Sequence, residues 1–142
     1  MCLTLTEKSG IKVAEEDIVC YKVVRKLCLG LYRSEFYAYL YDVGTLNASV
    51  FGVTITTRPY IIYQSTGQGI SGYEQVVERG FHSFTCKEDA YKYVEYATDR
   101  ILGDINMVVV KCIIPKGADY IEGTYSECPN YVSNKIICLG EI

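Results

Sequence analysis

The chain has 142 residues, a formal charge of −3 at pH 7 and a sequence pI of about 5.2. A length of this order suits one domain with its own hydrophobic core, and the acidic balance disfavours broad electrostatic contact with duplex nucleic acid or an anionic membrane. No run of about 18 to 20 apolar residues predicts a membrane helix, and Met1–Gly10 lacks the pattern of a signal peptide, so we expect a cytoplasmic, soluble protein.

Seven cysteines occur, and no two of them have the spacing of two or three residues that zinc sites usually show. We therefore expect no metal site. The odd count predicts reduced thiols, with those in apolar runs filling the core. Cys86 lies four residues from His82, but its place at a helix start favours packing over catalysis. The seven are Cys2, Cys20, Cys28, Cys86, Cys112, Cys128 and Cys138.

Two strands are predicted early in the chain. Asp17–Leu29 is dense in β-branched and apolar residues without helical spacing, and Phe36–Val43 alternates with the strand period of two. The second strand places a row of tyrosines on one face: Tyr37, Tyr39 and Tyr41. Such a row can stack on a nucleotide base, pack against neighbouring strands or form a protein interface, and packing is the favoured interpretation.

The middle of the chain predicts less regular structure. Val50–Thr57 and Tyr60–Tyr63 are predicted as separate strands, because Pro59 interrupts their hydrogen-bond ladder. The glycine- and serine-rich Gln64–Tyr73 predicts a long mobile loop, and Glu74–Arg79 predicts a turn or two of helix. The loop contains the letters of a dinucleotide-binding fingerprint, but no full helix follows them, so a plain loop is favoured.

One helix is predicted over Lys87–Leu102, after a brief strand at Phe81–Phe84. Thr85 as N-cap and Glu88 at the third helical position form a capping box. The apolar residues that recur with the helical period are Ala90, Tyr93, Val94, Ala97 and Ile101.

The C-terminal part predicts three more strands. Met107–Ile114 contains a Val-Val-Val run that indicates burial on both faces, and Pro115–Gly117 forms a turn. Ala118–Glu122 and Lys135–Gly140 complete the set. Many short strands and one clear helix predict a single α+β domain over residues 1–142, with a mostly antiparallel or mixed sheet covered by the helix.

The segments DIVCYKVV, GFHSF, VVVKCIIPKG and YVSNKII, with an amphipathic helix between the second and third, resemble a family of short uncharacterised proteins of gut bacteria and their phages. The match covers most of the chain. The resemblance implies an accessory protein of a phage or mobile element and carries no activity with it.

The order of these motifs is also remotely similar to ADP-ribosyltransferase-like folds, which hold a nicotinamide dinucleotide between two small sheets. On that resemblance Tyr21-Lys22 takes the place of an aromatic-arginine pair and Ser83 that of a serine on a middle strand. The place of the family's glutamate, near Ser133-Asn134-Lys135, holds no acid. The resemblance therefore implies the fold more than the transfer chemistry.

We hypothesise a non-catalytic module that binds a small nucleotide-like ligand or a host protein, with no cofactor and no catalytic residue. One alternative is an ADP-ribosyltransferase-like enzyme that uses NAD, and another is an assembly protein with a tyrosine-rich interface. His82, the only histidine, is favoured as a structural residue. The candidate ligand-binding residues are Tyr21, Lys22, Arg25, Tyr39, His82 and Ser83.

Overall fold

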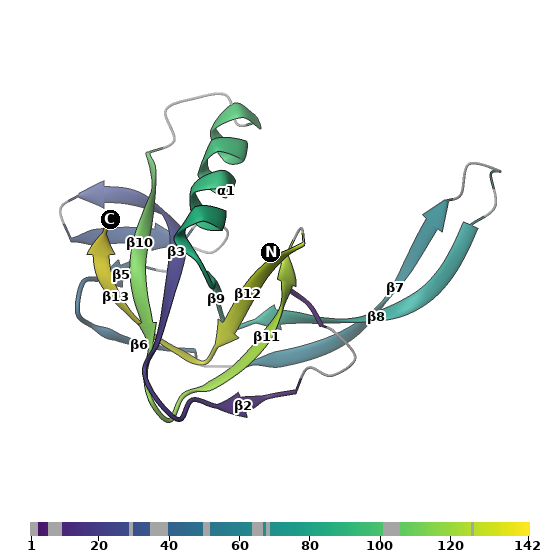
Figure 1. Ribbon diagram of the computed structural model, residues 1–142, viewed down its shortest axis with the longest axis horizontal. Helices are drawn as coiled ribbons and strands as arrows, with labels where there is room; N and C mark the ends of the chain where they lie inside the picture. Colours follow the sequence, from purple (N-terminus) through teal and green to yellow (C-terminus); the bar gives the residue numbers. More distant parts are fainter. Residues whose placement is uncertain are drawn as a thin grey trace.

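The computed structural model describes residues 3–5, 10–28, 30–34, 40–49, 52–63, 67, 69–100, 106–125 and 127–142. Within these ranges the chain forms thirteen strands and a single α-helix, and the strands join in one antiparallel sheet (Figure 1). The strands are β1 Leu3–Thr4, β2 Lys12–Val13, β3 Ile18–Cys28, β4 Leu31–Ser34, β5 Leu40–Asp42, β6 Leu46–Ala48, β7 Thr54–Tyr63, β8 Gly69–Arg79, β9 Phe81–Phe84, β10 Met107–Ile114, β11 Asp119–Tyr125, β12 Cys128–Ser133 and β13 Lys135–Glu141. The helix, α1, spans Lys87–Arg100.

The expected α+β class is wrong, because the described residues form a β-rich fold with one short helix. The largest difference lies in β8, a strand that starts at Gly69 and includes the second half of the expected loop and all of the expected helical turns. β7 likewise continues through Pro59 as one strand. Cross-strand hydrogen bonds between distant segments override weak local preferences, which is the usual reason for such errors.

Several local predictions are confirmed. The long first strand, the brief strand before the helix and the strand with the Val-Val-Val run appear as β3, β9 and β10. α1 begins at Lys87 as expected, whereas its expected end at Leu102 lies outside the described residues. With Lys87 as the first helical residue the N-cap is Cys86, one position later than expected, and Asp89 is the third helical residue. No helix among the described ranges is long and apolar enough to cross a membrane.

β3 is the central strand of the body. It pairs with β10 along one edge, and with both β9 and β4 along the other. β10 continues to β13 and β6, whereas β9 continues to β12, β11, β1 and the β7–β8 hairpin. Strands far apart in the sequence therefore meet at β3.

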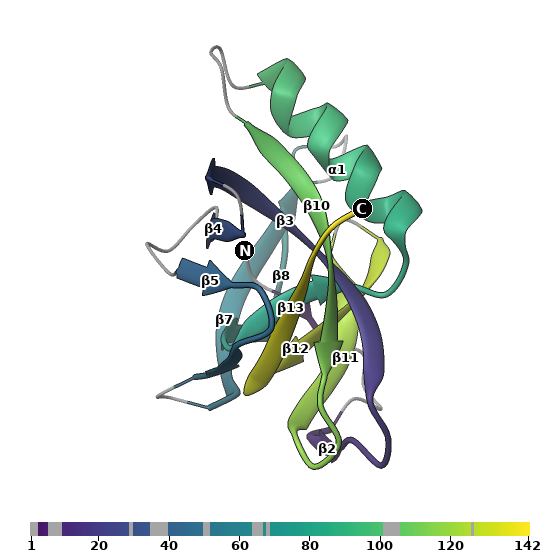
Figure 2. The same ribbon diagram turned by 90° about the vertical axis from the view of Figure 1, so that its left-hand side faces the viewer.

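Both faces of β3 and β10 carry buried side chains, as the Val-Val-Val run indicated for Met107–Ile114, although Val19 of β3 is 44 % exposed. α1 lies along one of them, which we call the helix face, and packs Ala90 against Val23, Phe84 and Val109 (Figure 2). The opposite face, which we call the cysteine face, carries the largest buried cluster. That cluster includes Cys20, Val24, Tyr32, Tyr41, Phe81, Val110, Cys112, Ile114, Ile136 and Cys138.

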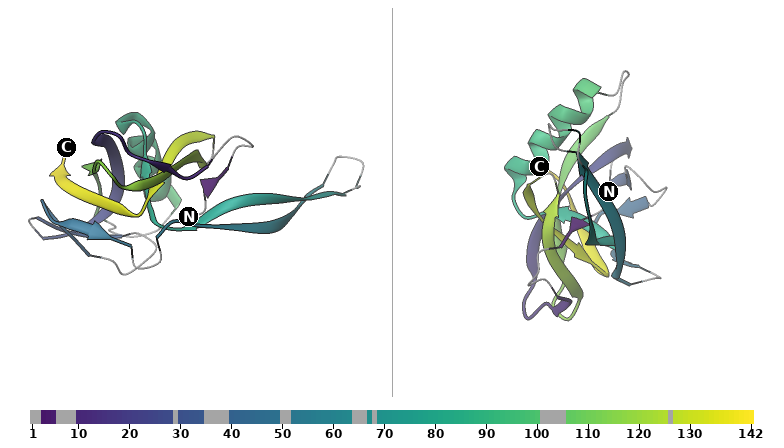
Figure 3. Two further views of the ribbon diagram at one scale, coloured as in Figure 1. Left: turned by 90° about the horizontal axis from the view of Figure 1, so that it is seen from below. Right: turned by 90° about the vertical axis from the view of Figure 1, so that its right-hand side faces the viewer.

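The β7–β8 hairpin leaves the body as a long two-stranded projection (Figures 1 and 3). Among the described residues β7 pairs with β8 alone, and β8 is tied to the rest of the sheet by β1, which pairs with Val76 and Val77. We call positions 57–75 the arm. Where its strand side chains are described, at residues 69 and 72–75, none is buried.

Gly80 forms the corner between β8 and β9. Its φ of 125° lies in a region that favours glycine, and an added Cβ would lie 2.5 Å from Val132 Cγ1. The sharp change of direction that separates the arm from the body therefore depends on this glycine.

Candidate functional site

Lys22 is a buried cation on the cysteine face of β3. Its side chain is 8 % exposed, and its Nζ donates a hydrogen bond to the carbonyl oxygen of His82. The ammonium also lies 5.5 Å from the centroid of the Tyr41 ring. A buried charge needs such partners, because an unsolvated ammonium is costly, and a backbone carbonyl and an aromatic face both stabilise positive charge.

Ser83 lies opposite Lys22 across the β3–β9 pair. The register of Tyr21 with Phe84 places Ser83 one step along the ladder, on the same face as Lys22. Ser83 is 1 % exposed, and its Oγ makes no hydrogen bond of ordinary geometry with any described residue. Its polar neighbour is the Cys20 thiol, whose pKa the hydroxyl helps to lower against the larger effect of burial. Lys22 and Ser83 therefore belong to one polar patch inside the core.

Three thiols form a row across this face. Cys20 is paired with Cys112 between β3 and β10, and Cys112 with Cys138 between β10 and β13. All three are at most 1 % exposed. Burial raises the pKa of Cys20 to about 11. In the Cys112–Cys138 pair the hydrogen bond between the thiols raises the pKa of Cys112 and lowers that of Cys138, which the Lys22 charge lowers further.

His82 points away from Lys22, although its carbonyl binds Lys22. Its Nδ1 lies 3.3 Å from the Gly80 carbonyl oxygen and its Nε2 lies 3.3 Å from that of Val77. Burial and the positive charge of Lys22 lower the His82 pKa to about 4, so the imidazole is neutral at pH 7. A neutral imidazole donates through one nitrogen only, so the ring satisfies one of its two carbonyl neighbours.

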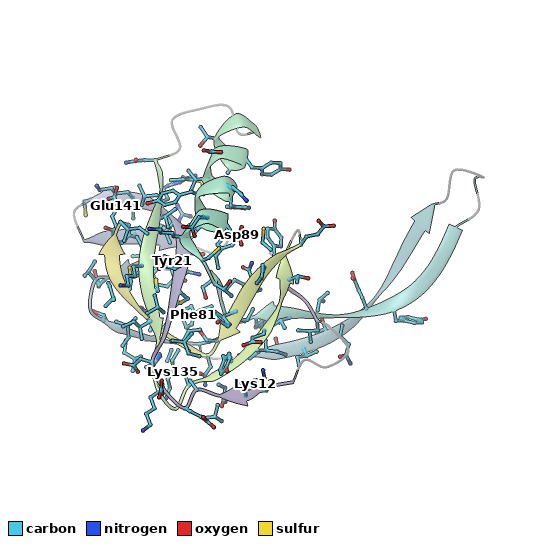
Figure 4. The ribbon with its side chains drawn as sticks, in the orientation of Figure 1. Lys12, Tyr21, Phe81, Asp89, Lys135 and Glu141 are labelled. Carbon is cyan, nitrogen blue, oxygen red and sulfur yellow. The ribbon has the colours of Figure 1, made fainter. Side chains whose placement is uncertain are left out.

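The remaining predicted residues lie elsewhere. Tyr21 packs on the helix face beside α1 (Figure 4), which places its side chain on the opposite side of the sheet from Lys22. Arg25 is exposed and stands directly opposite Arg33 of β4. Tyr39 lies outside the described residues. The structure thus brings Lys22 and Ser83 together and separates Tyr21, Arg25 and the His82 imidazole from them.

The prediction that the cysteines in apolar runs, Cys20, Cys112 and Cys138, fill the core is confirmed, but sequence reasoning missed that they form a row, and it missed the arm. The three cysteines are dispersed in sequence and become neighbours only through the register of β3, β10 and β13. The one available signal was that each lies within an apolar strand pattern.

The polar patch on the cysteine face has the character of a structural core. Its amine, hydroxyl and thiols are at most 8 % exposed, so a substrate would have to displace core side chains to reach them. In the described part of the chain no three His, Cys, Asp or Glu side chains gather in a way that could hold a metal ion.

The arm is the second candidate site, and it has the opposite character. Tyr73 of β8 is 78 % exposed, and Ile55 at the base of β7 is 38 % exposed. The part of β7 beyond Arg58 reads Pro-Tyr-Ile-Ile-Tyr, which is unusually apolar for a hairpin in water.

The edges of the arm differ in what they offer to another strand. Gln75 of β8 stands opposite Thr57 of β7. Its carbonyl oxygen accepts a hydrogen bond from the Leu5 N–H at 3.1 Å, so the backbone groups of Gln75 point toward the N-terminal segment and away from β7. Because bonded and non-bonded pairs alternate along an antiparallel ladder, Arg58 and Glu74 are a bonded pair and Pro59 faces outward from β7. Pro59 therefore leaves the β7–β8 ladder intact and removes a donor from the outer edge.

Comparisons of the chain with protein-family models, with curated proteins and with solved structures found no match.

Proposed function

We propose that this protein is a non-catalytic binding module whose arm contacts another protein. The single observation that carries the proposal is the projection of the β7–β8 hairpin away from the hydrophobic core (Figure 3). An isolated two-stranded hairpin is marginally stable in water, because it can bury little apolar surface of its own. A partner that covers the arm would supply the missing burial.

The composition of the arm supports a protein as the partner. Tyrosine is enriched in protein interfaces because it offers a large, rigid contact area with one polar end. Tyr60, Tyr63 and Tyr73 all belong to the arm, together with Ile61, Ile62 and Ile70. The acidic chain and this apolar, aromatic hairpin do not favour a nucleic-acid phosphate backbone as the ligand.

The mode of contact follows from Pro59. A strand added to the outer edge of β7 would meet a position with no N–H, which interrupts a continuous ladder. We therefore expect the partner to pack on a face of the hairpin. The nucleotide-like ligand receives less support, because Lys22, His82 and Ser83 are buried and lie on both sides of the sheet.

Site-specific photocrosslinking tests the proposal. Tyr73 is replaced by the photoreactive benzoylphenylalanine, which is similar in shape, and the variant is irradiated in the cells from which the gene comes. The matched control carries the same group at Tyr96, a tyrosine of α1 that is 55 % exposed. We expect a discrete protein adduct at position 73 that is absent at position 96. The proposal fails if position 73 gives no adduct or the same adducts as position 96.

The same experiment separates two kinds of partner. An adduct between two copies of this chain would support the assembly protein among the hypotheses, and light scattering of the purified protein would then report a dimer or larger species. An adduct with a different protein would support the binding module in its narrower sense.

A further inference from the structure

Two cysteines outside the buried row, Cys86 and Cys128, lie beside the start of α1. The β9–β12 ladder pairs Phe84 with Asn130, and the Thr85 N–H donates to the Pro129 carbonyl at 3.4 Å. The paired strands end at Phe84 and Asn130 and residues 85 and 86 bend toward α1, but the Thr85–Pro129 hydrogen bond extends the contact to the residues next to Cys86 and Cys128. The two residues lie 42 positions apart in sequence, so only the folded register brings them together.

The position of this pair in the ladder suits a disulfide. Thr85 and Pro129 share a hydrogen bond, so Cys86 and Cys128 would form a non-bonded site if the ladder continued one residue into the bend at residues 85 and 86. At such sites the Cα atoms of an antiparallel pair approach to about 4.5 Å, which lies within the range that disulfides accept. Both thiols are free and neither Cys86 nor Cys128 is fully buried, unlike the row on the cysteine face.

The Asp89 carboxylate influences both thiols, and Cys86 is one of the neighbouring groups that raise the pKa of Cys128. Two opposing effects act on the pKa of Cys86. The hydrogen bond from the Asp89 N–H to the sulfur lowers this pKa, but burial and the Asp89 carboxylate together raise it by more, so the net shift is upward. The pKa of Cys128 is raised by burial and then by the same carboxylate. Asp89 lies in the first turn of α1 (Figure 4), and its carboxylate raises the pKa of both thiols.

We propose that Cys86 and Cys128 form a reversible cross-strand disulfide that ties the N-terminus of α1 to β12. The oxidant is a small disulfide such as oxidised glutathione. The thiolate of one cysteine attacks it, forms a mixed disulfide and releases one small thiol, and the second cysteine then displaces the other. Two protein thiols are oxidised, one small disulfide is reduced to two thiols, and these thiols take up the two protons.

The consequence of this bond would be local. In the reduced protein the Cys86 sulfur accepts the N–H of Asp89 and so caps the first turn of α1. The disulfide replaces that cap by a covalent link to β12, and α1 covers the helix face of β3 and β10. The inference does not depend on the arm or on its partner.

Peptide mapping tests the inference directly, because trypsin places each of the seven cysteines on a different peptide. Cys86 lies on Gly80–Lys87 and Cys128 on Gly117–Lys135. The full chain is incubated with oxidised glutathione at about pH 8, where a larger fraction of thiol is ionised, then alkylated and digested without reduction. We expect these two peptides to appear linked, two hydrogens lighter than their sum, and to separate with dithiothreitol.

Variants and a second readout keep the test decisive. Cys86→Ser and Cys128→Ser should each abolish the linked peptide, whereas Cys28→Ser, which removes an exposed cysteine, should preserve it. In the unchanged protein, alkylation of Cys86 and of Cys128 should be lost in parallel during oxidation. A link between another pair such as Cys112 and Cys138, or glutathione adducts on the two separate peptides alone, would overturn the inference.

Discussion

At the scale of single residues, the protein buries Lys22 and His82 and gives both of them backbone carbonyls as partners. Lys22 donates to the carbonyl of His82, while the His82 ring contacts two further carbonyls. These contacts link β3, β9 and the end of β8 without an exposed charge. Replacing one member of such a network leaves the others unsatisfied, which is why buried polar clusters specify a fold strictly.

The His82 ring predicts an acid-sensitive stability. Its pKa is about 4 in the folded protein and 6.5 in the unfolded chain, so the unfolded state binds the proton more readily. The stability that the neutral His82 ring contributes is complete above pH 6.5 and decreases as the pH falls toward 4. The shift corresponds to about 3 kcal/mol at most. The measurement is the free energy of unfolding in urea at several pH values between 7 and 4. It should fall more steeply with acid in the wild type than in His82→Gln, and the difference between the two profiles is the contribution of His82.

A matched lysine pair tests the cause of that shift. Lys22→Met removes the positive charge that helps to lower the His82 pKa, so the loss of stability should still begin near pH 6.5 but end at a higher pH than in the wild type and be smaller. Lys26→Met, on the same strand, removes a lysine that pairs with Glu141 at 2.8 Å and should leave the profile unchanged. Equal profiles for both variants would contradict the assigned role of Lys22.

Of the candidate ligand-binding residues predicted from sequence, only Lys22 and Ser83 lie together, and the reason is geometric. The strand period of two places Tyr21 and Lys22, and likewise His82 and Ser83, on opposite faces. Which face of each strand α1 covers depends on the position of the helix, and sequence does not give that position. The candidates therefore included neighbours that the fold separates.

At the scale of elements, the arm explains the largest error in the predicted secondary structure. Gln64–Tyr73 has the composition of a loop, yet Gly69–Tyr73 forms the first part of β8. The strand pairs with β7 through backbone groups that glycine and serine carry as well as any residue. Pro59 was interpreted as a break, but a proline that faces the outer edge costs the ladder nothing.

The arm should contribute little to the stability of the body. Residues 59–73 are replaced by Asn-Gly, a two-residue turn that closes on the bonded pair of Arg58 and Glu74. The variant should unfold with a free energy within about 1 kcal/mol of the wild type, because the described core lies outside the removed segment. Denaturation followed by circular dichroism measures this. A loss of several kcal/mol would mean that the arm unfolds together with the core.

At the scale of the whole molecule, long-range pairing decides both the fold class and the sites. β12 carries Pro129 and Asn130 and gives a weak strand signal, yet it pairs with β9 and β11. The thiol row and the Cys86–Cys128 pair arise from registers between segments that are distant in sequence. Local patterns predicted β3, β9, β10 and the start of α1, whose periodicity is strong, and they missed what depends on partner strands.

The molecule combines a packed β-rich body with the arm, positions 57–75, whose described side chains all lie outside the core. The body buries Lys22, Ser83 and the three thiols of the cysteine face, whereas the arm presents Tyr73 to solvent. This division of roles is what the proposed binding module requires.

The most direct measurement is the affinity of the protein captured at Tyr73 for the wild-type chain and for the arm-trimmed variant, determined by calorimetry. If the arm is the binding element, trimming it should raise the dissociation constant at least tenfold, which corresponds to a loss of about 1.4 kcal/mol in binding free energy. Equal affinities for the two chains would contradict the account and assign the partner's contact to the body.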